Sequence, residues 1–310
     1  MGKIAVLFPG QGAQYVGMGQ DIYQELEESK EVFNSANKSL NYQLSDICFN
    51  GPEEDLKKTE ITQPAILTTC MALYETLKQR GVSPQATAGL SLGEYCALVA
   101  SGVLSFEDAV ALVAKRGKFM QEAVPLGVGT MAAIIGLDAD EIKQICQQVE
   151  GIVEIANYNC PGQIVIGGEV AAVEKAMELC SAKGARKVVK LAVSAPFHTS
   201  MLQKAKEQLA EELNRIDIAK ANIPVASSVT GDYISEDTDI KDLLALQVCS
   251  SVKWEKAMRT LLNEGFDTFI EVGPGKTLRG FMRRIDKKAK VINVYDNETL
   301  NKAIDILEAN

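Results

Sequence analysis

A serine between two glycines is the first residue whose setting suggests chemistry. Gly89-Leu90-Ser91-Leu92-Gly93 forms a G-x-S-x-G pattern, which follows the apolar run 86–90 and precedes a helical pattern over 93–100. A strand, a tight turn and a helix in this order make a nucleophile elbow, which exposes the serine hydroxyl. The alternative is an ordinary structural turn, since the chain holds 24 glycines. The setting favours a nucleophile.

A serine nucleophile needs a base within hydrogen-bond reach. The chain contains 1 histidine, His198, in the Pro-broken stretch 194–200. Loops of this kind often carry functional residues, although a lone histidine is more often a structural one. The serine pattern favours His198 as the base, and the pattern does not identify a third residue to orient it.

Two further features have a functional and a structural interpretation. Gly10 and Gly12 follow the apolar run 3–8, and their backbone freedom allows either inward-facing N–H groups or a plain turn. Arg116 shares a helix face with Leu112 and Val113. The pattern alone favours an arginine that reaches solvent. The alternative is a guanidinium that grips a carboxylate with two hydrogen bonds.

Elements on both flanks of the chain alternate between strand and helix, which predicts a mostly parallel sheet. We expect strands at 3–8, 86–90, 224–228, 268–272 and 291–294, and helices at 15–27, 63–79, 93–100, 106–122, 202–216, 240–247, 253–264 and after 275. The middle segment differs. Strands at 129–136, 153–158, 163–167 and 186–193, with helices at 138–149 and 170–182, follow the βαββαβ order of a ferredoxin-like module.

The predicted fold is therefore α/β, with a larger α/β-hydrolase-like subdomain and a smaller ferredoxin-like subdomain inserted in it. The larger subdomain would comprise residues 1–124 and 194–310, and the smaller one residues 125–193.

Composition limits the classes of function. There are 41 acidic and 32 basic residues and the net charge is −9, which argues against broad nucleic-acid binding. The 7 cysteines show no C-x-x-C spacing, so we expect no disulfide framework and no zinc or other metal site. Apolar runs are too short for a signal peptide or a membrane span. We expect a cytoplasmic enzyme, with a monomer as the default.

Six short motifs occur in order along the chain. They are FPGQGAQ at 8–14, GLSLGEY at 89–95, KRGKFMQ around Arg116, NYNCPGQ at 157–163, SAPFHTS at 194–200 and EVGPG at 271–275. Together they resemble the malonyl-CoA:acyl carrier protein transacylase family of bacterial type II fatty acid synthesis, and the resemblance runs from about residue 3 to 294.

The resemblance implies a ping-pong acyl transfer. Ser91 would take malonyl from coenzyme A and hand it to the phosphopantetheine thiol of acyl carrier protein. His198 would act as base and then as acid. The backbone carbonyl of Gln247, seven residues before Trp254, would orient the imidazole. No permanently bound cofactor is implied.

The resemblance also implies a substrate site. The N–H groups of Gln11 and Leu92 would form the oxyanion hole, and Arg116 would bind the malonyl carboxylate. Gln11, Asn159 and Phe197 would contact substrate. The ring of Phe197 leaves little room for an α-methyl branch, which favours malonyl over methylmalonyl by about 10- to 200-fold. Many relatives carry histidine where this chain has Leu90, so a second imidazole is absent here.

Acyl carrier proteins are typically acidic, so docking to this acidic chain needs a local basic patch. The candidates, which could equally be solvated faces, are Arg186, Lys187 and Lys190, and the run Arg279, Arg283, Arg284, Lys287, Lys288 and Lys290. Arg283, Arg284 and Lys287 form the core of the second group.

Three rival functions remain open at this stage. A serine hydrolase such as an esterase or thioesterase shares the elbow. A non-catalytic docking protein would retain only the fold. A trans-acting acyltransferase of polyketide synthesis uses the same chemistry, and the residues do not separate it from the fatty acid enzyme.

Overall fold

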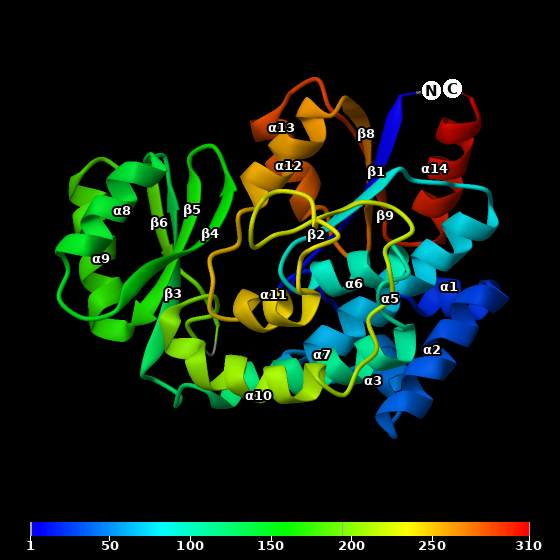
Figure 1. The fold of residues 1–310 in the computed structure, drawn as a ribbon, viewed down its shortest axis with the longest axis horizontal. Coiled ribbons are helices and arrows are strands. Elements are labelled where there is room, and N and C mark those ends of the chain that lie inside the picture. The colour runs from blue at the N-terminus through cyan, green and yellow to red at the C-terminus, as the bar shows by residue number, and fades with distance from the viewer. Residues whose placement is uncertain (1, 194, 310) are drawn as a thin grey trace.

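A five-stranded parallel sheet forms the centre of the larger part of the molecule. The computed structural model describes residues 2–193 and 195–309. The strands are β1 (Lys3–Phe8), β2 (Ala86–Gly89), β7 (Val225–Ala226), β8 (Phe266–Val272) and β9 (Lys290–Val294), in the order β7-β2-β1-β8-β9. Every pairing is parallel. β1 is buried from its second residue onward, because helices cover both faces of a parallel sheet (Figure 1).

Helices surround this sheet. They are α1 (Gln20–Glu25), α2 (Glu27–Leu40), α3 (Leu44–Asn50), α4 (Glu53–Leu56), α5 (Thr59–Gln79), α6 (Gly93–Ala100), α7 (Phe106–Glu122), α10 (Gln203–Leu213), α11 (Ile240–Gln247), α12 (Trp254–Asn263), α13 (Thr277–Ile285) and α14 (Asn297–Glu308), with a short 3-10 turn at Ser200–Leu202. α5 is buried around nearly its whole circumference and packs against α2 and α7.

Some boundaries differ from those expected. The helix predicted over 15–27 begins only at Gln20, because Gly17 and Gly19 have positive φ angles of 99° and 78°. A break at Leu26 then separates α1 from α2. α5 begins at Thr59 rather than at residue 63.

A four-stranded antiparallel sheet forms the smaller part. Its strands are β3 (Gly129–Ile135), β4 (Val153–Cys160), β5 (Gln163–Glu169) and β6 (Lys187–Lys190), in the order β4-β5-β3-β6. α8 (Ala139–Gln148) and α9 (Val170–Ala182) pack on one face. This order confirms the ferredoxin-like arrangement, although β6 is shorter than the predicted strand 186–193.

The other face of this small sheet joins the core of the larger part. Met131 and Val165 belong to the same apolar cluster as Phe8 and Leu202. Val252, just before α12, pairs with Asn157 of β4. The division into 1–124 plus 194–310 and 125–193 stays a prediction, and residue 194 at its boundary lies outside the described residues.

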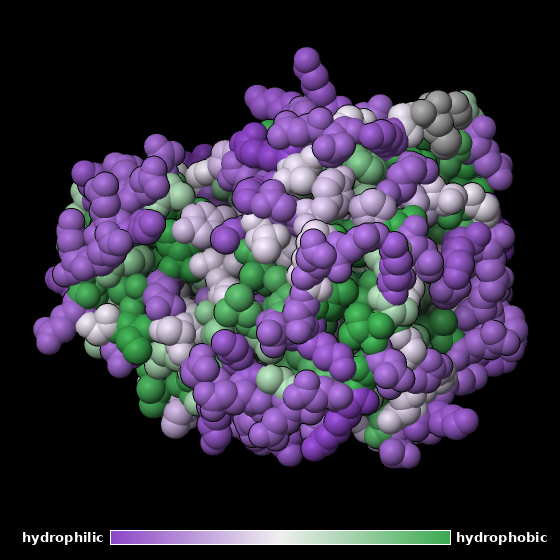
Figure 2. All heavy atoms as spheres, in the orientation of Figure 1, coloured by the Kyte–Doolittle hydropathy of each residue, from purple (hydrophilic) through white to green (hydrophobic). Residues whose placement is uncertain are grey.

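The distribution of polar and apolar side chains over the surface is that of a folded globular domain. On the face drawn in Figure 2, polar side chains cover most of the periphery and apolar ones collect toward the middle. Among residues 2–193 and 195–309, no helix is long and apolar enough to cross a membrane. All 7 cysteines are free, and six of them are buried.

Candidate active site

The G-x-S-x-G segment forms a sharp turn between β2 and α6. Ser91 has a φ of 54°, which is uncommon for a residue other than glycine. Both glycines are required by close backbone contacts. A Cβ atom would lie 1.9 Å from the Gly93 backbone if added at Gly89, and 2.2 Å from the Phe8 carbonyl oxygen if added at Gly93. The turn is thus wedged against the end of β1, with Ser91 half-buried at its tip.

The loop after β1 packs on the same turn. A Cβ atom at Gly10 would lie 2.6 Å from the Leu90 carbonyl oxygen. Leu90 in turn donates its N–H to the Phe8 carbonyl at 3.0 Å. These contacts hold Gly10, the residue before Gln11, against the turn that leads into α6, whose N-cap residue is Leu92. In the described part of the chain, no hydrogen bond uses the N–H of Gln11 or Leu92. Their role as oxyanion donors stays a prediction.

His198 is hydrogen-bonded to Ser91. Its Nε2 lies 2.6 Å from Ser91 Oγ, and its Nδ1 lies 2.9 Å from the Gln247 carbonyl oxygen. Because a carbonyl only accepts, Nδ1 must carry the proton, which leaves Nε2 free to accept from the serine hydroxyl. Burial, and then the nearby Arg116 cation, lower the pKa of His198 to about 4. The imidazole is therefore a neutral base near pH 7.

Arg116 does not reach solvent, so the interpretation that the helical pattern alone favoured is wrong. The side chain is only 1% exposed. Its Nη1 donates to Gln63 Oε1 at 2.8 Å, and its Nη2 donates to Gln247 Oε1 at 2.8 Å and to Ser91 Oγ at 3.2 Å. The guanidinium also lies 5.3 Å from the centre of the Tyr95 ring. Among residues 2–193 and 195–309, the buried atom Nε has no hydrogen-bond partner.

The sequence did not predict a role for three side chains at this site. Gln63 and the amide of Gln247 hold Arg116, and Glu94 accepts a hydrogen bond from Gln247 Nε2. Gln63 and Glu94 were visible as polar residues in mostly apolar helices, which is a weak signal. The side chain of Gln247 gave no signal, because only its backbone had a predicted role.

Two of the predicted substrate-contacting residues, Phe197 and Asn159, are buried in the structure. Phe197 is 8% exposed and directly precedes His198. Asn159 is 6% exposed and lies where the pairing of β4 with β5 shifts register, between Tyr158 and Cys160. Among the described residues no hydrogen bond links Asn159 to Ser91 or His198.

Residues from the two predicted basic clusters lie near each other in the structure. Lys187 of β6 is paired with Ile135 of β3, which is paired with Gln163 of β5. Arg284 of α13 donates to Gln163 Oε1 at 3.1 Å. Lys187 and Arg284 therefore lie at the same end of the small sheet. Lys190 instead forms an ion pair with Glu174 at 2.7 Å.

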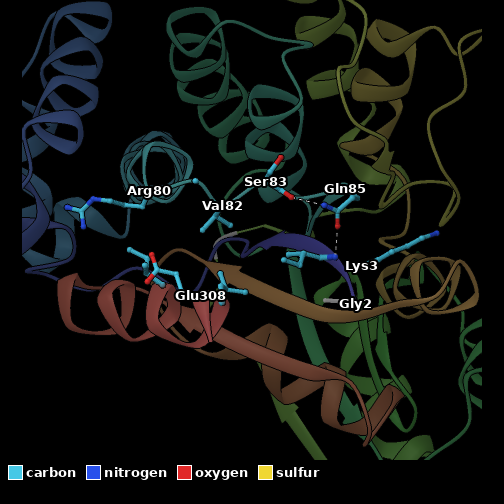
Figure 3. A pocket seen from close by; sticks show the side chains of 11 residues that line it. Gly2, Lys3, Arg80, Val82, Ser83, Gln85 and Glu308 are labelled. Carbon is cyan, nitrogen blue, oxygen red and sulfur yellow. Dashed lines mark hydrogen bonds between the residues drawn. The ribbon is translucent and has the colours of Figure 1, made fainter. Parts of the chain in front are cut away.

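Two cavities bear on the choice of site. One, of about 540 Å³, reaches His198 between α8, β4 and the residues after α11. The other, of about 480 Å³, lies at the start of β1 beside the end of α14 (Figure 3). There the Gln85 side chain bridges the Ile4 N–H and the Ser83 carbonyl. None of the predicted site residues lines this second cavity.

An α/β fold with a hydrogen-bonded serine and histidine at a strand-turn-helix defines an enzyme that forms acyl-serine esters. The family model described as "Acyl transferase domain" matches residues 6–297. A malonyl CoA-acyl carrier protein transacylase of Bacillus subtilis is 48% identical over 311 residues, which cover 99% of this chain and 98% of that protein. The chain belongs to this family of malonyl CoA-acyl carrier protein transacylases.

Solved structures agree with this assignment. The transacylase of Clostridium perfringens superposes with a TM-score of 0.97 at 50% identity, covering 99% of this chain and 98% of that one. A malonyl-transacylase in complex with a type II PKS acyl-carrier protein has a TM-score of 0.95 at 38% identity, covering 98% and 99%.

Proposed function

We propose that this enzyme carries malonyl between coenzyme A and the phosphopantetheine thiol of acyl carrier protein as an ester on Ser91. The family supplies the overall activity, malonyl transfer in fatty acid synthesis. The observation that carries the assignment of roles is the 2.6 Å contact between Ser91 Oγ and His198 Nε2, beside the buried Arg116.

The first half-reaction loads the serine. Ser91 Oγ attacks the thioester carbonyl carbon while His198 Nε2 takes the hydroxyl proton. The tetrahedral intermediate then expels the coenzyme A sulfur, which receives that proton from Nε2. The Gln247 carbonyl stabilises the imidazolium through Nδ1–H, as a carboxylate does in other serine enzymes.

The second half-reaction is the reverse with another thiol. The carrier protein thiol gives its proton to His198 and attacks the ester carbonyl. The bond to Ser91 Oγ breaks, and Oγ recovers the proton from Nε2. In both directions the N–H groups of Gln11 and Leu92 are proposed to stabilise the oxyanion.

Arg116 is proposed to bind the malonyl carboxylate. Its Nε has no partner and its Nη2 points to Ser91 Oγ, so one edge of the guanidinium faces the site of the ester. A carboxylate can take two parallel hydrogen bonds from such an edge. Two further hydrogen bonds, from Nη1 to Gln63 and from Nη2 to Gln247, hold the guanidinium in this orientation. An acyl group with its own carboxylate fits this arrangement better than a neutral one.

Two features support finer specificity. The ring of Phe197 is proposed to exclude an α-methyl branch, and Asn159 is proposed to contact the bound acyl chain.

The proposed docking surface for the carrier protein is the basic end of the small sheet. It comprises Arg186, Lys187, Arg283, Arg284 and Lys287.

The experiment that tests the proposal is mass spectrometry after brief exposure to malonyl-CoA. We expect a malonyl mass increment on the peptide that contains Ser91, lost in Ser91→Ala and removed by holo acyl carrier protein. No increment would overturn the proposal. Release of free coenzyme A at the same rate with and without carrier protein would indicate a serine hydrolase instead.

A polyketide carrier protein is a second candidate acceptor, since one similar structure is that of a transacylase bound to such a partner. Comparison of kcat/KM for carrier proteins of both pathways separates the two.

A further inference from the structure

Glu94 is a fully buried carboxylate next to the nucleophile. It lies in the first turn of α6, three residues after Ser91, with 0% exposure. The Ser228 N–H donates to Oε1 at 3.2 Å, and both Ser228 Oγ–H, at 2.7 Å, and Gln247 Nε2–H donate to Oε2. A buried carboxylate is costly unless such donors compensate for the lost water. The proposed mechanism does not use this group.

Glu94 determines which way the Gln247 amide points. Gln247 Nε2 faces two acceptors, Glu94 Oε2 and, at 3.1 Å, the Ser91 carbonyl oxygen. Its Oε1 accepts from Arg116 Nη2 at 2.8 Å. A reversed amide would set its NH2 group against the guanidinium and its oxygen against a carboxylate. Burial raises the pKa of Glu94, while the hydrogen bonds from Ser228 and Gln247 oppose that rise and favour the carboxylate. The acceptor oxygens of Glu94 thus keep the Gln247 oxygen toward Arg116.

Gln247 connects this carboxylate to the base as well. Its backbone carbonyl accepts from His198 Nδ1, and it is the last residue of α11. One residue therefore contacts the base, the carboxylate-binding arginine and the elbow. We infer that Glu94 is a positioning residue, which acts through the Gln247 side-chain amide to hold Arg116 in place beside Ser91. This inference rests on the proposed function.

The Gln247 side-chain amide separates the charge of Glu94 from that of Arg116. Arg116 is a buried cation, and burial lowers its pKa, while Tyr95 and, to a smaller extent, the charge of Glu94 oppose that shift. A direct pair between Glu94 and Arg116 would occupy guanidinium donors that a malonyl carboxylate needs. With Gln247 interposed, its Oε1 takes one hydrogen bond from Nη2, and Nε keeps no partner among the described residues.

The test measures the rate of Ser91 acylation with malonyl-CoA and with acetyl-CoA in Glu94→Gln and Glu94→Ala. Glu94→Gln retains the volume and removes the charge. We expect the malonyl rate to fall about 10-fold in Glu94→Gln and about 30-fold in Glu94→Ala, since loss of a charged hydrogen-bond partner typically has effects of this size. The acetyl rate falls less than about threefold, because acetyl makes no use of the Arg116 fork.

The matched control is Glu271→Gln. Glu271 is also 0% exposed and accepts from Leu278 N–H, Arg279 N–H and Asn293 Nδ2. Loss of this carboxylate lowers the melting temperature but leaves the malonyl-to-acetyl ratio unchanged. Arg116→Ala is the opposite reference, because it should strongly lower the ratio of the malonyl rate to the acetyl rate.

An unchanged malonyl-to-acetyl ratio in Glu94→Gln, with both rates reduced alike, overturns the inference. So does an equal change of ratio in Glu271→Gln. If Glu94→Ala does not fold, the isosteric Glu94→Gln decides alone. Absence of a malonyl increment on wild-type Ser91 is a failure of the proposed function itself, and the inference falls with it.

Discussion

At the scale of single residues, Arg116 should decide which acyl groups the enzyme accepts. Replacement by alanine removes two charge-assisted hydrogen bonds to the malonyl carboxylate, so kcat/KM for malonyl-CoA should fall about 100-fold or more. Acetyl-CoA should be affected much less. The control is Arg80→Ala, whose side chain lies at the cavity beside α14. Steady-state rates with both thioesters check this, and equal losses would argue against a carboxylate contact.

His198 should remain an active base well below neutral pH. With a pKa of about 4 the imidazole is almost wholly neutral at pH 5.5. The rate of Ser91 malonylation should therefore change by less than about twofold between pH 8 and 5.5. A histidine with the usual pKa of about 6.5 would lose roughly tenfold. Rapid-quench mass spectrometry over this range distinguishes the two.

The same depressed pKa makes stability depend on pH. Below about 6.5 the unfolded chain binds a proton that folded His198 takes up only near pH 4. Stability from this group is thus present above about pH 6.5 and is lost as the pH falls toward 4. Between pH 7.5 and 5 the wild type should lose about 2 kcal/mol more than His198→Gln. Urea unfolding at both pH values measures this, and parallel curves would contradict it.

At the scale of elements, the elbow depends on the close approach of α6 to β1. Gly93→Ala would force a Cβ atom to within 2.2 Å of the Phe8 carbonyl oxygen. We expect a loss of about 3 kcal/mol in the free energy of unfolding, since backbone atoms cannot relax as a side chain can. Gly280→Ala, on the exposed side of α13, meets nothing within 4 Å. That control should gain about 0.5–1 kcal/mol from helix propensity. Similar stabilities for the two variants would refute the wedged turn.

The elements also show which patterns were informative. α7 and α9 have the predicted bounds, because each has a distinct apolar face that is buried. α6 also has the predicted bounds, although residues 93–98 are all buried. The helix expected over 15–27 was misjudged, because its pattern continued through two glycines in left-handed conformation. The βαββαβ order was readable from alternation and turn residues alone, and it led directly to the observed small sheet.

At the scale of the whole molecule, charge should guide the carrier protein. Reversal of Arg283, Arg284 and Lys287 to glutamate should raise the KM for acyl carrier protein about tenfold at low salt, and less as salt screens the attraction. Ser91 malonylation by malonyl-CoA should be unchanged, and a fall there would indicate contact with coenzyme A phosphates. Lys302→Glu on α14 is the control. An unchanged KM would exclude this surface.

The local chemistry was readable from the sequence: a serine in a tight turn, the glycines that flank it, and a single histidine. Each is a local property, set by neighbours in the chain or by composition. Which side chains surround these groups depends on the tertiary structure. Gln63 and Gln247 lie far apart in sequence, yet both accept hydrogen bonds from Arg116, and Glu94 accepts one from Gln247. Helical spacing could not reveal that this arginine is buried, because burial depends on which elements pack over that face of α7.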